Sequence, residues 1–321
     1  MMKKHIILFS MALVLFSVFC ETRAEFKKVA TTGYSFLEIS VSPRMSGMGE
    51  ILTPWHHAGA EALFGNPGQL GFLETDHAFY LGYAPYLADT RLQTIGYAYH
   101  NELLGVFGLS FNQLDMGEMT HTVNADPSNP GGSYQVLGKY SANALAVGLT
   151  YARRLINTFS FGVNIKYVRE QISDYASDNF VFDVGMLYFT EFGSMRLGGY
   201  IQNFGVDATY LSESFKMPML FRLGVAGEVL GDFESNHRLT LAVEAIHPSN
   251  YTERVHIGAE YAFQNIVMLR SGYKFNYDEG GFTAGLGLQW PSEGYKTRVD
   301  ISYTDFGLLG SVLRFGLNAT F

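Results

Sequence analysis

The residues of this chain whose types could do chemistry include the adjacent histidines His56 and His57 and the glycine-rich run at 285–287. His56 and His57 invite a metal site, because imidazole is a common metal ligand. Adjacent side chains point apart in an extended chain, and no cysteine or carboxylate recurs at ligand spacing around this pair. We therefore interpret it as a loop pair and expect neither a metal nor a cofactor.

The run Gly285-Leu286-Gly287 lacks the third glycine and the strand-to-helix context of a dinucleotide-binding loop. Small residues lining a crowded barrel interior explain it better. No Gly-x-Ser-x-Gly nucleophile elbow occurs, and we expect no enzyme, although Ser and His from separate strands could still meet. A net charge of −8 argues against a nucleic-acid partner, because that partner needs a basic surface.

The amino-acid composition indicates which kind of fold positions these residues. Charged residues make up 16% of the 321 residues, against about 25% in soluble domains. Aromatic residues reach 15%, and 35 residues are glycine. This composition is untypical of a helical soluble enzyme.

The first 24 residues read as a secretory signal peptide. Lys3 and Lys4 precede an apolar stretch from 6 to 19, and Ala24 ends a small-residue cleavage site. That stretch is short for a bilayer-spanning helix, which needs about 20 residues. A retained anchor helix and lipid attachment at Cys20 are the alternatives. Cys20 is the single cysteine, so the processed chain would carry no disulfide.

From residue 76 onward, apolar and polar residues alternate in segments bounded by turn residues, which predicts strands. The last segment shows the pattern: Leu313, Phe315 and Leu317 share one face, while Arg314 and Asn318 share the other. We predict fourteen strands: 76–85, 92–100, 103–115, 139–153, 158–171, 178–189, 194–204, 218–229, 236–246, 253–263, 266–276, 281–290, 294–304 and 310–321.

Three features favour a transmembrane antiparallel outer-membrane β-barrel over a secreted sandwich or propeller. The segments match the 9–11 residues that a tilted strand needs to cross a bilayer. Aromatic residues gather near strand ends, as interfacial girdles require. Short connections alternate with long ones at 116–138 and 205–217. Because the strand number is even, both termini are expected in the periplasm, on the short-turn side.

Residues 25–75 differ, because prolines and glycines interrupt every periodic run. We expect this apolar segment to fill the barrel lumen as a hatch. The inner faces of the first three strands are apolar and need such a cover. The inner faces of later strands carry seven basic and four acidic residues, which we expect to form cross-strand ion pairs: Arg222, Glu228, Arg238, Glu244, Glu260, Arg270, Lys274, Lys296, Arg298, Asp300 and Arg314.

The chain resembles the PorV/PorQ family, a member of the FadL-like outer-membrane barrels. The similar pieces are Phe36-Leu37-x-Ile39, Arg44, Met48-Gly49, Asn66-Pro67-x-x-Leu70 and Tyr86-Leu87-Ala88-Asp89. The chain departs from the family pattern at Glu50, at Gly68 and at the pair His56-His57, where the family has glycine, alanine and an acidic pair. The resemblance implies a fourteen-stranded barrel with an N-terminal segment in the lumen.

For function, the resemblance implies a scaffold or shuttle that engages exported cargo or components of type IX secretion. The alternatives are a FadL-like conduit for a hydrophobic small molecule and a purely structural barrel. Candidate residues for ligand or partner contact in the hatch are Arg44, Met48, Gly49, Asn66 and Pro67. The terminal Phe321 is similar to the signal that the outer-membrane assembly machinery reads. Outer-membrane lipid is the remaining expected partner.

Overall fold

The computed structural model describes residues 32–56, 58–125, 128, 133–210, 213–292 and 294–321. The predicted signal peptide, residues 1–24, lies outside the described residues, as does the beginning of the predicted hatch segment. His57, half of the histidine pair, also lies outside them.

In the described part of the chain, fourteen antiparallel strands close into one barrel, as predicted. Neighbours in sequence pair with each other, and β1 closes the ring on β16 with Tyr80 opposite Asn318. The barrel strands are β1 (His77–Pro85), β2 (Arg91–Asn101), β3 (Gly105–Asn124), β4 (Tyr134–Ile156), β5 (Phe159–Ile172), β6 (Tyr175–Phe189), β7 (Arg196–Gly205), β10 (Leu220–Leu230), β11 (His237–Pro248), β12 (Arg254–Phe263), β13 (Val267–Phe275), β14 (Phe282–Ser292), β15 (Tyr295–Asp305) and β16 (Ser311–Thr320).

The period-two pattern of the sequence sorts side chains between lipid and lumen. Along β2, exposed Ile95 and Tyr97 alternate with buried Thr94 and Ala98. The exposed positions of the other strands are likewise mostly apolar. A closed barrel pairs every backbone group within its wall, so an apolar outer surface makes it suited to span a bilayer.

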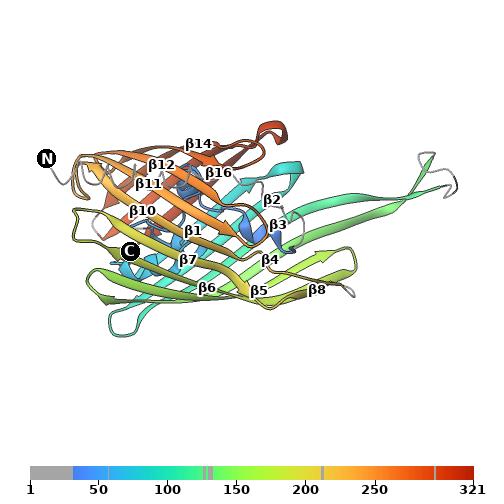
Figure 1. Ribbon diagram of the computed structural model, residues 1–321, viewed down its shortest axis with the longest axis horizontal. Coiled ribbons are helices and arrows are strands. Elements are labelled where there is room, and N and C mark those ends of the chain that lie inside the picture. The colour runs from blue at the N-terminus through green and yellow to red at the C-terminus, as the bar shows by residue number, and fades with distance from the viewer. Residues whose placement is uncertain (1–31, 57, 126–127, 129–132, 211–212, 293) are drawn as a thin grey trace.

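The two ends of the barrel differ (Figure 1). At the short-turn end, β4 and β5 are joined through residues 157–158, and Phe321 exchanges backbone hydrogen bonds with His77 at 2.9 and 2.8 Å. At the long-loop end lie the β3–β4 hairpin and a small sheet of β8 (Ala208–Tyr210) and β9 (Glu213–Phe215). Short 3₁₀ turns η4 (Leu87–Asp89) and η5 (Gly307–Leu309) also connect strands there.

The prediction of a loop over 116–138 was wrong for most of that segment. Here β3 continues to Asn124 and β4 begins at Tyr134, and the two form a ribbon that projects beyond the barrel (Figure 1). The reason is that cross-strand pairs such as Met119 with Tyr140 prolong the ladder past the membrane region. Likewise, β8 and β9 occupy part of the predicted 205–217 loop.

The described part of the hatch starts at the long-loop end, where Thr32 forms a bridge with Lys216, and runs into the lumen. Its elements are η1 (Ser35–Glu38), α2 (Pro43–Ser46), η2 (Gly59–Phe64) and η3 (Pro67–Phe72). Prolines at the first turn and side-chain caps from Ser42 and Asn66 start α2 and η3. None of the helices in the described ranges has the length and apolarity to cross a bilayer.

Glycines in the wall let the hatch backbone touch it. A Cβ at Gly272 would lie 2.2 Å from the Gly49 nitrogen, and one at Gly198 would lie 2.2 Å from the Thr53 oxygen. Gly285 faces Gly47 in the same way, at 3.2 Å, which explains part of the Gly285-Leu286-Gly287 run as small interior residues.

The inner faces of β1–β3 are covered by η2, as expected. Ala60, Ala62 and Leu63 form one buried cluster with Tyr80 and Ala98 of the wall. This packing removes from water an apolar inner surface that an open lumen would leave wet.

We predict that an arginine on the lipid face destabilises the barrel in a depth-dependent way. Val299 lies midway along the outer face of β15, between Tyr295 and Tyr303 near its ends. Val299→Arg should cost about 2–4 kcal/mol, whereas the control Tyr295→Arg should cost about 0–1 kcal/mol. Denaturant unfolding in lipid vesicles measures both, and equal costs would contradict this lipid-facing assignment.

Candidate functional site in the barrel lumen

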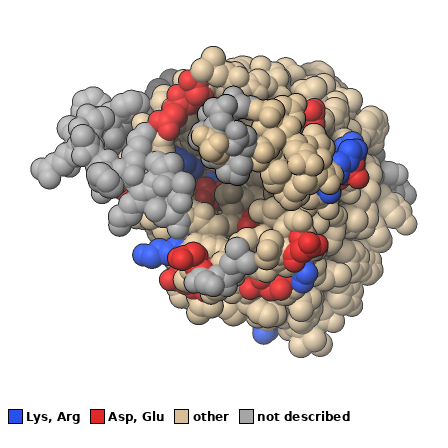
Figure 2. Space-filling model, turned by 90° about the vertical axis from the view of Figure 1, so that its right-hand side faces the viewer, with Lys and Arg blue, Asp and Glu red and all other residues tan. Residues whose placement is uncertain are grey.

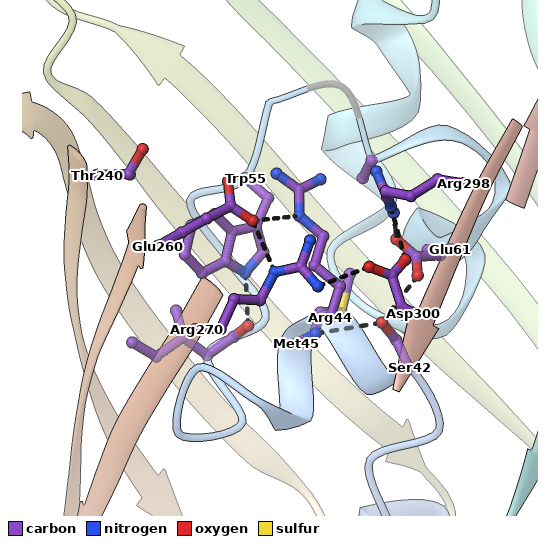
Figure 3. Close-up of polar contacts among 12 residues, drawn as sticks. Ser42, Arg44, Met45, Trp55, Glu61, Thr240, Glu260, Arg270, Arg298 and Asp300 are labelled. Carbon is purple, nitrogen blue, oxygen red and sulfur yellow. Dashed lines mark hydrogen bonds and ion pairs between the residues drawn. The ribbon is translucent and has the colours of Figure 1, made fainter. Parts of the chain in front are cut away.

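An ion-pair network joins the hatch to the wall at Arg44 (Figure 3). The Arg44 Nε lies 3.5 Å from the Glu260 carboxylate of β12, and the Arg270 Nε of β13 donates to the same carboxylate at 2.7 Å. The Arg44 guanidinium also lies over the Trp55 ring, 5.6 Å from its centroid. Burial lowers the pKa of Arg44 to about 10, a shift that Glu260 opposes, so Arg44 stays charged at neutral pH.

The network continues through Asp300 of β15. Its carboxylate accepts hydrogen bonds at 2.6 Å from both the Arg270 Nη1 and the Arg298 Nε. Arg298 also donates to Glu61 of η2 in the hatch. Hatch and wall thus supply alternating charges, and each buried charge meets an opposite one.

Glu50 forms a second attachment. It holds φ = +60°, a left-handed conformation unusual for a residue other than glycine. Its carboxylate accepts a hydrogen bond from the Lys274 Nζ at 3.2 Å and lies 3.9 Å from the Arg314 Nη2. Burial alone would raise the pKa of Glu50, but Lys274 and Arg314 outweigh it and lower the pKa to about 2.

Glu244 of β11 clamps the next stretch of the hatch. One of its carboxylate oxygens accepts from the Leu52 N–H at 3.0 Å, the Thr53 N–H at 2.8 Å and the Thr53 hydroxyl at 2.7 Å. The other oxygen accepts from Arg222 at 2.9 Å. A buried wall carboxylate therefore orders a segment that has no helix or strand of its own.

Asn66 and Pro67 fix the opposite side of the hatch. The Asn66 amide donates to the carbonyls of Thr53 at 2.9 Å and Met186 at 2.8 Å, and its oxygen accepts from the Gly68 N–H at 2.9 Å. Pro67 presses on Gly162 of β5, where a Cβ would lie 2.5 Å from the proline carbonyl carbon.

The five hatch candidates do not meet in one pocket. Arg44, Met48 and Gly49 face β12–β14, whereas Asn66 and Pro67 face β5 and β6. Gly49 has φ = +74° and donates its N–H to the Thr283 hydroxyl at 2.9 Å, while Met48 is fully buried over Gly258. All five are buried, which suits anchoring of the hatch; contact with a ligand or partner stays a prediction.

The sequence analysis named Glu50 as a departure from the family pattern and Glu244 as an inner-face residue, but it predicted neither the hatch-to-wall contacts of these two residues nor the role of Glu61. The surplus of seven basic over four acidic residues on the later inner faces was the available signal, because buried positive charge requires negative charge from elsewhere. The expected cross-strand ion pairs are present, including Arg222–Glu244 and Arg270–Glu260.

His56 packs edge-on against Phe189, with ring centroids 4.9 Å apart, and near Phe72 and Phe233. Within the described ranges, no group of three His, Cys, Asp or Glu side chains could hold a metal ion. Phe321 lies at the short-turn end against His77, with ring centroids 5.3 Å apart. Its role as an assembly signal stays a prediction.

Towards the long-loop end, the lumen holds what we name the apolar lumen cluster. Its hatch members are Tyr34, Phe36, Leu37 and Val41. Figure 2 looks onto this end and shows a recess with acidic and basic side chains around it. The other members of the cluster are Ala84, Leu92, Leu114, Ala144, Ala146, Val168, Val181, Ala208, Met217 and Val312.

Two cavities lie on different sides of the hatch and share no lining residue. A cavity of about 40 Å³ beside the apolar lumen cluster is lined by Leu37 and Phe64 but also by Lys166 and Asp183. A larger one of about 290 Å³, which we name the short-turn vestibule, lies among Arg44, Arg196, Arg238, Arg270, Lys296 and Arg298.

Solved structures match this architecture over most of its length. The Ralstonia pickettii toluene transporter TbuX has a TM-score of 0.58 at 13% identity, covering 87% of this chain and 96% of its own. The Pseudomonas putida toluene transporter TodX has a TM-score of 0.56 at 13% identity, covering 86% and 95%. A FadL homologue from Pseudomonas aeruginosa has a TM-score of 0.52 at 11% identity, covering 88% and 98%.

This chain has the FadL-like outer-membrane barrel fold. That part of the expected resemblance is confirmed, whereas membership of the PorV/PorQ family stays a prediction. No protein family model matches the chain, and no curated protein matches it in sequence.

We predict that Arg44→Ala loosens the hatch more than it affects barrel assembly. The change leaves Glu260 without one of its buried cationic neighbours, and breaking a buried ion pair costs about 3–5 kcal/mol. Limited proteolysis should cut residues 25–75 faster, while the heat-modifiable gel mobility of the barrel should persist. The control Arg169→Ala removes an exposed arginine paired with Asp178 and should leave the cleavage unchanged. Equal cleavage of R44A and wild type would refute the anchoring role.

We predict that acid weakens hatch attachment through Glu50. Its pKa is about 2 in the folded protein and 4.5 as the ordinary value, so its stabilising contribution is complete above pH 4.5 and is lost as the pH falls to about 2. Glu50→Gln should flatten the pH dependence of hatch protease protection in this window. Glu118→Gln, which changes an exposed glutamate of the ribbon, is the control. Identical pH profiles of E50Q and wild type would exclude this contribution.

Proposed function

We propose that this protein is a FadL-like conduit that admits a hydrophobic small molecule into the lumen of an outer-membrane barrel. The observation that carries the proposal is the apolar lumen cluster. Once the hatch moves, this cluster would give an apolar solute a place to leave water.

The composition of the cluster suits such a solute. Small wall residues such as Ala144 and Ala146 alternate with Leu114 and Val168, and Phe36 and Tyr34 of the hatch complete the surface. Tyr34 also donates a hydrogen bond from its hydroxyl to Ser177 at 2.8 Å, which fixes its ring. The apolar members of this surface place no charge against the solute.

The fold comparisons support the same reading, since TbuX and TodX are described as toluene transporters. Similarity of fold alone does not establish that two proteins share a substrate. The fold and the apolar lumen cluster together favour a hydrophobic small molecule as the substrate class, and we assign the chain no enzymatic role.

Transport requires the hatch to move. Its backbone touches wall glycines such as Gly198 and Gly272, and its charges pair with β12–β15. A solute in the apolar lumen cluster contacts η1, so it can bias hatch conformations by binding one of them better. We therefore regard the described arrangement as the closed state of the conduit.

We further propose an outer-membrane location with the short-turn end in the periplasm. Outer-membrane barrels place short turns on the periplasmic side and long loops outside. Phe321 then lies on the periplasmic side, and the signal peptide, residues 1–24, would direct export. For the scaffold hypothesis, engagement of exported cargo or secretion components, we find no contact surface in the described part of the chain that favours it over the conduit.

We predict that Leu114→Gln slows uptake of an apolar solute. The amide would bring an unpaired polar group into the apolar lumen cluster, which costs about 1–3 kcal/mol in proteins. Uptake of radiolabelled toluene by Gram-negative cells producing the protein should fall several-fold. The control is Leu308→Gln in η5, where the leucine is 90% exposed.

The conduit is rejected if cells producing wild-type protein take up toluene no faster than cells without it, at equal surface abundance of folded barrel. Extraction of purified protein followed by mass analysis provides a second test. An empty lumen in repeated preparations would also count against the proposal.

A further inference from the structure

The short-turn vestibule exists because the hatch does not fill the lumen evenly. At the short-turn end, η3 packs on β5 and β6, with Ser160 donating to the Gly68 carbonyl at 2.7 Å. The opposite side, along β10–β16, is left open over about 290 Å³. Thr75, Asn265 and Thr320 near strand ends form part of its lining, which places it at the short-turn mouth.

The vestibule is lined by more basic than acidic side chains. Six basic residues and four acidic ones line it, the acidic ones being Glu74, Glu228, Glu234 and Glu260. Two of these carboxylates are already neutralised within the wall. Arg196 Nη1 contacts both oxygens of Glu228 at 3.0 Å, and Glu260 lies within 3.8 Å of three arginines.

Several donors on the basic side are unused. Among the described residues, the Lys296 side chain is exposed, lines the vestibule and has no hydrogen bond or ion pair. Arg238 donates from Nη1 to the Phe233 carbonyl at 3.1 Å and to the Asn265 side-chain oxygen at 3.0 Å, while its Nη2 lies 3.8 Å from Glu260, longer than a hydrogen bond. The Arg270 Nη2, on a fully buried side chain, has no hydrogen-bond partner.

We propose that the short-turn vestibule is a binding site for a small oxyanion, a phosphate or carboxylate group. Lys296 would supply a mobile charge at the mouth, and the Arg238 Nη2 a donor beside it. The buried arginines behind them are already paired with Glu61, Glu228, Glu260 and Asp300, so Lys296 is the charge left for the anion. Gln289 and Asn318 also line the vestibule, and their amides already donate to the Asn265 and Ala58 carbonyls.

This site is separate from the conduit. It lies across the hatch from the apolar lumen cluster, and it requires neither hatch movement nor an apolar solute. The anion-binding test can therefore fail without contradicting the conduit, and the uptake test can fail without contradicting the anion site.

The experiment is isothermal titration of the purified full-length barrel in detergent with inorganic phosphate and, separately, with succinate. We expect saturable binding of at least one anion, and K296Q should weaken it at least fivefold. The double variant K296Q/R238Q should abolish it. Lys139→Gln is the matched control, because it removes one positive charge from the ribbon outside the barrel and should leave the affinity unchanged.

Two results would overturn the proposal. One is the absence of saturable heat with either anion at millimolar concentrations. The other is binding that K139Q weakens as much as K296Q does, because it would mean attraction by overall charge and not by the vestibule. Heat-modifiable gel mobility of each variant confirms that the barrel has folded, so a loss of binding is not a loss of fold.

Discussion

Buried charges inside the barrel have to be matched by other buried charges, and this constraint organises the lumen. Removing a charged group from water costs several kcal/mol unless an opposite charge and hydrogen bonds replace the water. Arg270 of β13 and the pair Arg298 and Asp300 of β15 satisfy part of this need within the wall. Arg44 and Glu61 of the hatch complete it, so the position of the hatch depends on the wall charges.

The strands could be predicted from the sequence because the residue pattern of each strand reflects lipid on one side and the lumen on the other. Leu313 and Phe315 face lipid while Arg314 faces the lumen, and this alternation needs no knowledge of the partner strand. The β3–β4 ribbon was missed because its outer part has neither lipid nor core to impose the pattern. Turn-forming residues near 126–132 favoured the prediction of a loop there instead.

The lumen site was harder to predict, because its contacts join residues far apart in the chain. That a hatch exists follows from an apolar, glycine-rich segment preceding the barrel. That Glu61 meets Arg298 or that Glu244 holds Thr53 depends on how the hatch lies against the strands, which no local pattern records. The glycines opposite the hatch backbone, such as Gly198 and Gly272, show that wall and hatch fit each other closely.

The β3–β4 ribbon carries a liability of its own. Pairing with β2 ends at Asp115 and pairing with β5 ends at Ala142, so beyond these residues both outer edges of the ribbon leave backbone groups unpaired by a third strand. Such edges are templates for intermolecular sheet growth. Irregular register near Asp115 and His121, together with the charged pair Glu118–Lys139, disrupts the flat edge that stacking requires. These irregularities therefore protect the projecting ribbon from self-association.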